Sequence, residues 1–263
     1  MPIFSANLSF LFQEHDFLDR FAASKEAGFK YIECCFPYDY SPEVLHGHLV
    51  RNGLKQVLIN MPAGDLNAGE LGLASDPDRM DEFRRGVRLA LDYAKILEID
   101  RINCLVGKRI EEKDLGEQRR VLLENVTFAS SELAKENKVL LIEPINTFEV
   151  PGFFLSTSRE CFELIHESAA ANLMLQYDVY HMQKMEGNLA ETIRENLHRI
   201  GHIQISDNPG RHQPGTGEIN YSFLLRELDK INYRGFVGLE YYPTSDTPSS
   251  LAWIREWGFE DRI

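Results

Sequence analysis

Hydrophobic positions gather into short runs that recur along the whole chain. Amphipathic stretches with helical spacing, such as residues 78–97 and 117–136, lie between these runs. Helix-ending residues precede most of the runs, as at Ala27-Gly28 and Arg234-Gly235. The pattern therefore predicts eight strands, at residues 3–12, 31–36, 55–61, 101–106, 139–145, 173–179, 202–206 and 236–242.

The alternation of strands and helices predicts parallel pairing. Nearly continuous apolar strands are buried on both faces, and eight strand-helix units in 263 residues fit an α/β fold of the (β/α)8 TIM barrel type. An open doubly wound sheet is the alternative. The first strand-helix turn has neither a GxGxxG nor a Walker sequence, which disfavours that sheet and a nucleotide cofactor. No change of composition marks a linker, so we expect one domain over residues 1–263.

Two carboxylates interrupt apolar runs. Glu143 is the only charge in Val-Leu-Leu-Ile-Glu-Pro-Ile, and Glu240 is the only charge in Phe-Val-Gly-Leu-Glu-Tyr-Tyr. Burying a carboxylate in a strand is costly unless the group is paired, protonated or bound to a cation. We therefore expect both glutamates where a strand opens into a site, and we take them as the candidate acid/base pair.

Polar residues end the expected strands in turn and predict a ring at the barrel mouth. Glu143, Asp178, Gln204 and Glu240 are separated by 35, 26 and 36 residues, near the length of one strand-helix repeat, so they should converge. Their oxygens suit Mg²⁺ or Mn²⁺, which prefer carboxylate and carbonyl ligands. The alternative is a set of ordinary hydrogen-bonded polar groups. The full ring is Asn7, Glu33, Asn60, Lys108, Glu143, Asp178, Gln204 and Glu240.

Four further residues are candidates for substrate binding. His181 follows Asp178 by three residues and leaves the same strand end, although a lone histidine is more often a satisfied core residue. Arg211 lies in a Pro/Gly-rich loop after the seventh strand and could clamp a carboxylate, or could be a solvated surface arginine. Lys108 and Glu149 are weaker candidates.

Two opposed glutamates can carry out a proton shuttle. One, ionised, removes a proton from carbon beside a carbonyl, a metal or a cation stabilises the enediolate, and the other returns a proton to the neighbouring carbon. This is the chemistry of sugar isomerisation. Glycoside hydrolysis also uses two carboxylates, but it leaves the converging Asp178, Gln204 and Arg211 without a role.

Charge and cysteine content limit the possible binding partners and indicate the cellular compartment. The chain has 41 acidic and 28 basic residues, a net charge of -13, which repels phosphate backbones and anionic bilayers but admits a small anionic substrate. We expect no nucleic acid and no membrane partner. The four cysteines show no CxxC spacing and should be reduced, and no signal peptide or membrane span is evident, so the cytoplasm is expected.

Several segments resemble hydroxypyruvate isomerases, a family of xylose-isomerase-like TIM barrels. They follow one another in the same order and at matching intervals over nearly the whole chain. They include Phe-Ser-Ala-Asn-Leu-Ser (4–9), Phe-Pro-Tyr-Asp-Tyr (36–40), Ile-Asn-Cys-Leu-Val-Gly (102–107), Leu-Leu-Ile-Glu-Pro-Ile-Asn (140–146), Gln-Tyr-Asp-Val-Tyr-His-Met-Gln (176–183), Pro-Gly-Thr-Gly-Glu-Ile-Asn-Tyr (214–221) and Gly-Leu-Glu-Tyr (238–241).

The resemblance implies interconversion of hydroxypyruvate and tartronate semialdehyde, with Glu143 and Glu240 at the proton-transferring positions. In related ketose epimerases, the positions of Glu143, Asp178, Gln204 and Glu240 hold a divalent metal, and those of His181 and Arg211 contact substrate. Those epimerases have histidine where this chain has Gln204. Amide oxygen is a weaker ligand than imidazole, so a lower metal affinity is expected.

Other activities are compatible with some of the same residues. A 2-oxo-tetronate isomerase or a ketose 3-epimerase would use the same acid/base pair. An apurinic-site endonuclease would need a histidine-rich zinc centre and a basic face, and this chain has only 8 histidines. A non-catalytic sugar-acid binding protein would not need two proton-transfer groups. Residues 249–259, with Trp253 and Trp257, are either core or the interface of a homo-oligomer.

Overall fold

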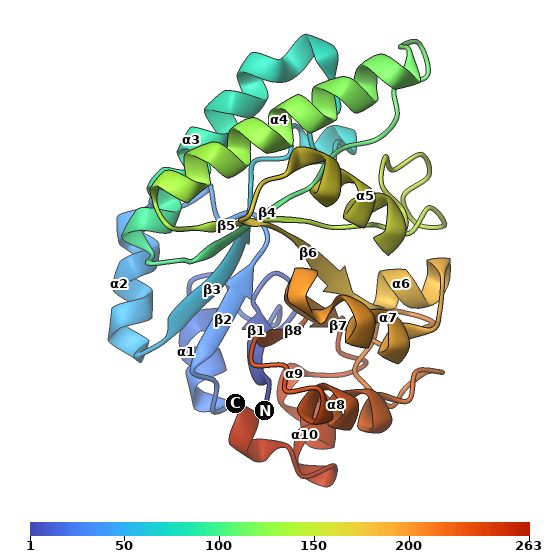
Figure 1. Ribbon diagram of the computed structural model, residues 1–263. Helices are drawn as coiled ribbons and strands as arrows, with labels where there is room; N and C mark the ends of the chain where they lie inside the picture. Colours follow the sequence, from blue (N-terminus) through green and yellow to red (C-terminus); the bar gives the residue numbers. More distant parts are fainter.

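Eight parallel strands close into one barrel in chain order, with β8 returning to pair with β1 (Figure 1). The computed structural model describes residues 1–263. The expected (β/α)8 barrel is confirmed, because each strand pairs in parallel with its neighbours in the sequence. The strands are β1 (Ile3–Asn7), β2 (Tyr31–Cys34), β3 (Lys55–Asn60), β4 (Arg101–Cys104), β5 (Val139–Ile142), β6 (Leu173–Asp178), β7 (Ile200–Ile205) and β8 (Phe236–Leu239).

Helices surround the barrel and cover its outer face (Figure 1). Local signals set several of their starts: the Asp114 side chain accepts from the Glu117 backbone, and Thr157 with Glu160 forms a reciprocal capping box. The helices are α1 (Arg20–Glu26), α2 (Pro42–Asn52), α3 (Met80–Ile96), α4 (Leu115–Lys135), α5 (Ser158–Ser168), α6 (Val179–Met185), α7 (Leu189–Asn196), α8 (Tyr221–Lys230), α9 (Thr247–Ser250) and α10 (Ala252–Glu256), with short 3₁₀ turns η1 (Leu66–Ala68), η2 (Pro77–Arg79), η3 (Leu197–Arg199) and η4 (Glu260–Arg262).

Every strand ends earlier than its hydrophobic run suggested, and two of these differences affect the barrel mouth. The run over residues 3–12 is a strand only as far as Asn7, whose side-chain oxygen accepts from the Ser9 backbone and turns the chain. The following residues form a loop at the barrel mouth. Strand β4 ends at Cys104, so Lys108 lies in the loop after it, and Asn103 is the inward polar residue at the end of this strand.

The main hydrophobic core of 63 buried residues lies largely between the barrel and its helices. The segment over residues 249–259 is divided at Leu251 into α9 and α10, and Trp253 packs on Phe4 with ring centres 5.4 Å apart, so this side chain belongs to the core. The rings of Tyr31 and Phe236 also pack together, tilted at 51° with their centres 4.8 Å apart. All four cysteines are free thiols.

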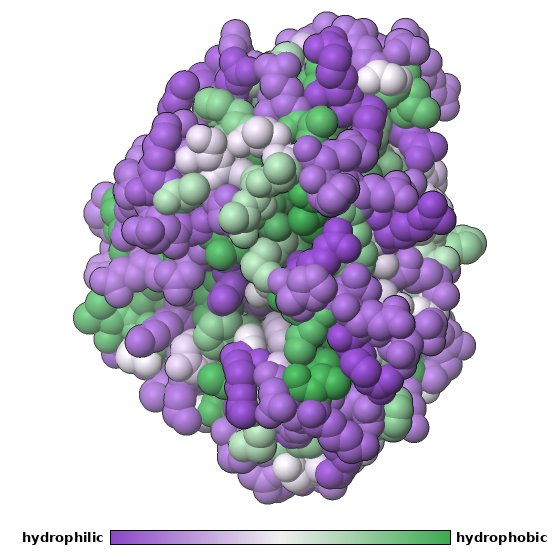
Figure 2. Space-filling view, in the orientation of Figure 1, coloured by the Kyte–Doolittle hydropathy of each residue, from purple (hydrophilic) through white to green (hydrophobic).

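The face of the molecule seen in Figure 2 is mainly hydrophilic, with hydrophobic residues scattered over it. The most exposed large hydrophobic side chain is Phe148 at 72%, in the loop after β5. None of the helices combines the length and the apolar character that crossing a bilayer requires.

Candidate active site

Four polar side chains meet at the C-terminal ends of β5 to β8. Glu143 follows β5 directly, Asp178 ends β6, Gln204 lies within β7 and Glu240 follows β8. They are 4%, 0%, 1% and 6% exposed, respectively. Parallel strands of a barrel open at the same end, which brings residues far apart in the sequence to one buried cluster.

Glu143 is held through one of its two oxygens. Its Oε2 accepts from the side-chain amides of Asn103 and Gln176, each at 2.8 Å. Its Oε1 lies 3.9 Å from Nε2 of His181. Burial, followed by the neighbouring Asp178 carboxylate, raises the pKa of Glu143 to about 8, so this group retains a proton at neutral pH.

Glu240 is held in the same way but faces a different partner. Its Oε2 accepts from the amides of Asn7 at 2.8 Å and Gln204 at 2.5 Å. Its Oε1 accepts from Nη2 of Arg211. Burial raises the pKa of Glu240 well above its ordinary value, and the Arg211 guanidinium opposes that rise by stabilising the ionised form.

Arg211 reaches the cluster from the loop after β7. Its Nη2 also donates to Oδ2 of Asp178 at 3.4 Å, and its guanidinium lies over the rings of Phe10 and Tyr180, 4.8 and 5.4 Å from their centres. Burial lowers the pKa of Arg211, but Glu240 and the other carboxylates outweigh it and keep the group charged. Its buried Nε has no partner in the protein and can donate to a bound oxygen.

His181 is a neutral donor in this arrangement. Asn146 donates to its Nδ1 at 2.7 Å, and the Asn146 carbonyl is held by the Glu149 backbone amide, so Nδ1 accepts and Nε2 carries the hydrogen. That Nε2 lies 3.5 Å from Oδ2 of Asp178. Burial, followed by Arg211, lowers the pKa of His181 well below its ordinary value, which keeps the ring neutral.

The two weaker candidates lie away from the glutamates. Glu149 is exposed and bonds to Lys184 at 2.8 Å, to Asn146 at 3.2 Å and to the Tyr180 hydroxyl, so it supports the rim of the site. The half-buried Lys108 donates to the Gly69 carbonyl at 2.7 Å, and no contact joins it to the buried carboxylates.

The sequence analysis missed several inward-facing residues beneath the cluster. Gln176 and His202 lie two residues before Asp178 and Gln204, and residues two apart in a strand point to the same face. This alternation could have identified them. Glu33 and Asn7 belonged to the expected ring but received no role, and both now contact the candidate residues.

Three of the buried groups are placed to hold a cation. Ligand atoms of Glu143, Asp178 and His181 lie within 4.8 Å of one another, and this donor set suits a divalent ion. The expected set contained Gln204 and Glu240 in place of His181. The Gln204 oxygen accepts from Gln176, and Glu240 faces Arg211, so neither joins this group as oriented.

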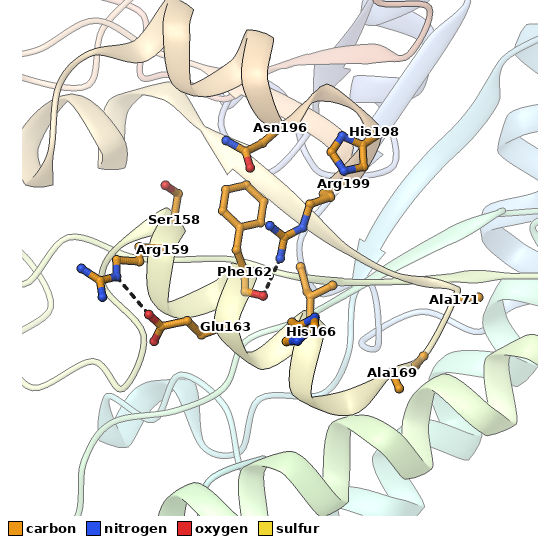
Figure 3. A pocket seen from close by; sticks show the side chains of 12 residues that line it. Ser158, Arg159, Phe162, Glu163, His166, Ala169, Ala171, Asn196, His198 and Arg199 are labelled. Carbon is orange, nitrogen blue, oxygen red and sulfur yellow. Dashed lines mark hydrogen bonds and ion pairs between the residues drawn. The ribbon is translucent and has the colours of Figure 1, made fainter.

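A separate cavity of about 930 Å³ lies on the outside of the barrel, along α5 and the turn before β7 (Figure 3). Phe162 and Arg199 meet there, and the Arg199 guanidinium donates to the Phe162 carbonyl at 2.5 Å. Arg159 pairs with Glu163 at its edge. The candidate metal group of Glu143, Asp178 and His181 lies at the barrel mouth and not in this cavity.

A closed (β/α)8 barrel with two buried glutamates, an imidazole and a guanidinium at its mouth defines an enzyme of acid/base type. Residues 21–257 match the model of the xylose isomerase-like TIM barrel, and the chain belongs to this family.

Relatives of this family are similar to the chain over nearly its whole length. Hydroxypyruvate isomerase of Escherichia coli (strain K12) is 48% identical over 251 residues, which are 95% of this chain and 97% of that protein. 2-oxo-tetronate isomerase of Cupriavidus necator is 42% identical over 257 residues, 98% and 99% of the two chains. The crystal structure of AP endonuclease, family 2, from Brucella melitensis superimposes with a TM-score of 0.95 at 40% identity, covering 97% and 99%.

Proposed function

We propose that this enzyme interconverts hydroxypyruvate and tartronate semialdehyde (2-hydroxy-3-oxopropanoate). One observation carries the proposal: Glu143 and Glu240 are each fixed through Oε2 and direct Oε1 toward a shared buried site, that of Glu240 in contact with Arg211. The relative from Escherichia coli supports the choice of substrate. The free thiols of all four cysteines support a cytoplasmic location.

The difference between the two glutamates assigns their roles. Glu240, paired with Arg211, is the ionised base that removes a proton from C3 of hydroxypyruvate. Glu143, with a pKa of about 8, is the acid that delivers a proton to C2 of the enediolate. The hydroxyl proton moves from O3 to O2, so the product has the same atoms as the substrate. In the reverse direction the two glutamates exchange roles.

Two neighbours stabilise the charge that develops on substrate oxygen. The neutral Nε2–H group of His181 donates to the enediolate oxygen, and Nε–H of Arg211 is free to hold the substrate carboxylate while Nη2 binds the protein's own acids. We propose that Mg²⁺ or Mn²⁺ would be held by the carboxylates of Glu143 and Asp178, with His181 as a third ligand only after Nε2 has given up its hydrogen; the ion would then replace the Nε2–H group as the positive charge beside the same oxygens.

Substitution of each glutamate tests the proposal. Glu143→Gln and Glu240→Gln should each lower kcat for hydroxypyruvate about a thousandfold, because each removes one proton-transfer group. Glu163→Gln, an exposed glutamate beside the outer cavity, should keep full activity. Full activity in either of the first two variants would contradict the two-glutamate scheme.

Hydrogen exchange in D₂O separates the two roles. Glu143→Gln retains the base, so it should still exchange the C3 hydrogens of hydroxypyruvate faster than an enzyme-free blank, whereas Glu240→Gln should not. NMR of the recovered substrate measures this difference. The opposite pattern would exchange the roles of the two residues.

A 2-oxo-tetronate isomerase is the second candidate, supported by the relative from Cupriavidus necator. It would use the same acid/base pair on a longer acid. Parallel assays with hydroxypyruvate, 2-oxo-tetronates and ketohexoses distinguish the two acids and also test a ketose 3-epimerase. The net charge of -13 and a candidate metal group with one histidine favour a small acid over DNA as substrate.

A further inference from the structure

A chain of side-chain amides joins the two candidate glutamates. Nε2 of Gln176 donates both to Oε2 of Glu143 at 2.8 Å and to the side-chain oxygen of Gln204 at 2.7 Å. Nε2 of Gln204 in turn donates to Oε2 of Glu240 at 2.5 Å. A continuous hydrogen-bonded path therefore runs from one glutamate to the other through two glutamines.

The orientation of both glutamines is fixed by their acceptors. The NH₂ group of Gln204 donates to Glu240 and also to Oε1 of Glu33 at 2.8 Å. Rotating this amide by half a turn would set its oxygen against two carboxylates and lose the bond from Gln176. The Gln176 oxygen has no donor, so its NH₂ group alone determines its orientation.

Glu33 anchors this path of side-chain amides. It is fully buried on β2 and accepts from the side chains of Ser5, Asn7, His202 and Gln204 at distances between 2.8 and 3.2 Å. Burial raises its pKa, but His202 and the hydrogen bonds outweigh burial and hold the pKa of Glu33 below its ordinary value. Glu33 is therefore an ionised group around which donors are arranged.

A glycine on the adjacent strand makes room for this carboxylate. Gly238 of β8 has no side chain, and a Cβ atom there would lie 2.3 Å from Oε1 of Glu33. Any larger residue would displace Glu33 or the strand. A glycine at this position of β8 therefore leaves the space that the buried Glu33 carboxylate occupies.

We propose that Gln176 and Gln204 are positioning residues that tie Glu143 and Glu240 into one acid/base unit, anchored on Glu33. The inference rests on the proposed function. In this proposal Gln204 donates hydrogen bonds to carboxylates. Its position in the sequence had suggested a metal ligand instead. Because Oε2 of each glutamate is fixed by amides, the proton passes through Oε1, which faces the neighbours of the site.

Replacement of each glutamine by methionine, of similar length and without a hydrogen-bonding group, tests the path. Gln176→Met and Gln204→Met should each lower kcat about ten- to a hundredfold, because small displacements of a proton-transfer group are costly. KM should stay within about threefold, since neither residue contacts substrate. The double variant should be little slower than the worse single variant, because either change breaks the same path.

Gln56→Met is the matched control. Gln56 is a buried glutamine of β3 whose amide bonds Cys34 and the Leu58 backbone and does not reach the glutamates. This variant should keep kcat. A kcat near the wild-type value in both path variants, a rise in KM alone, or losses that multiply in the double variant would each overturn the proposal.

Urea unfolding tests the path without any substrate. If the two glutamines act as one unit, the midpoint shift of the double variant should be smaller than the sum of the two single shifts. Additive shifts would overturn the proposal. A wild-type enzyme that does not turn over hydroxypyruvate would instead refute the proposed function, and the unfolding cycle would still decide whether the amide path exists.

Discussion

The two halves of the barrel mouth hold equivalent carboxylates with different partners. Glu143 and Glu240 are both buried, and each receives two amide N–H groups on Oε2. The outer oxygen of Glu143 faces a neutral imidazole, whereas that of Glu240 contacts the Arg211 guanidinium. Burial alone would favour the protonated form of both, so the outer partner decides which one can serve as a base.

This asymmetry suits a reaction that needs one acid and one base at the same pH. Three buried carboxylates, Glu143, Asp178 and Glu240, lie beside a single guanidinium, so the cluster retains at least one proton at neutral pH. Burial raises the pKa of both glutamates, and the proposal that Glu240 is the ionised one rests on its direct ion pair with Arg211. Substitutions of Arg211, Asn146 and Glu143 therefore test the proposed difference between Glu240 and Glu143.

Loss of Arg211 should have the largest effect of the three. Arg211→Met removes the only cation in contact with Glu240 and Asp178 and the group proposed to bind the substrate carboxylate. Truncating one partner of a buried charge pair costs about 2–5 kcal/mol. We therefore expect kcat/KM to fall about a thousandfold, with a clear rise in KM, in steady-state assays.

Arg211→Lys is the control for charge. It keeps a cation near Glu240 but loses the planar fork, so it should recover part of kcat while KM stays high. An unchanged KM in the methionine variant would remove Arg211 from substrate binding. Arg211 would then act on Glu240 alone, and another group would have to bind the substrate carboxylate.

Much of this site could be predicted from the polar residues at the ends of the expected strands. Charges inside apolar runs identified Glu143 and Glu240, and the near-repeat spacing placed Asp178 and Gln204 beside them, because strands of one barrel end at one face. The same logic failed for Lys108. Its hydrophobic run continued beyond Cys104, where β4 ends, and a run of apolar residues does not distinguish a strand from the buried loop that follows it.

The supporting residues were not predicted because their roles depend on contacts between distant strands. Gln176 and His202 look like ordinary polar positions until the barrel closes and brings them to Glu143 and Glu33. The hydrogen on His181 likewise depends on Asn146, whose amide is oriented by a backbone group three residues further on. Sequence spacing predicts which residues meet but not which atoms donate.

A smaller effect is expected from Asn146, which acts on the Glu143 half only. Asn146→Ala removes the shorter of the two N–H donors to Nδ1 of His181, the side-chain amide at 2.7 Å, and leaves only the backbone N–H of residue 146 at 3.4 Å, so the preference for a hydrogen on Nε2 weakens. We expect kcat to fall about tenfold with little change in KM, because the donor to the enediolate is then present only part of the time.

Nitrogen NMR of the labelled imidazole provides a direct measurement. The His181 signals should indicate a hydrogen on Nε2 in the wild type and a mixture of tautomers in Asn146→Ala. A wild-type ring with its hydrogen on Nδ1 would contradict the assignment and would make His181 a better metal ligand than a donor.

A last test concerns stability and isolates Glu143 from the catalytic cycle. Its pKa is about 8 in the folded chain and near the ordinary 4.5 in the unfolded chain, so the folded state binds the extra proton between these values. The contribution of this group to stability is therefore fully present below pH 4.5 and is lost as pH rises through 8. Glu143→Gln keeps the shape of the protonated carboxyl and removes this dependence.

The melting temperature of Glu143→Gln should accordingly rise relative to the wild type as pH increases from 5 to 8, and the difference should become constant above that. Each pH unit in the window contributes at most about 1.4 kcal/mol, and a chain of this length gains roughly 2–4 °C per kcal/mol. Calorimetry in EDTA measures the difference without divalent ions at the cluster. A difference that does not change with pH would mean that Glu143 is ionised in the folded enzyme, and the contrast with Glu240 would be lost.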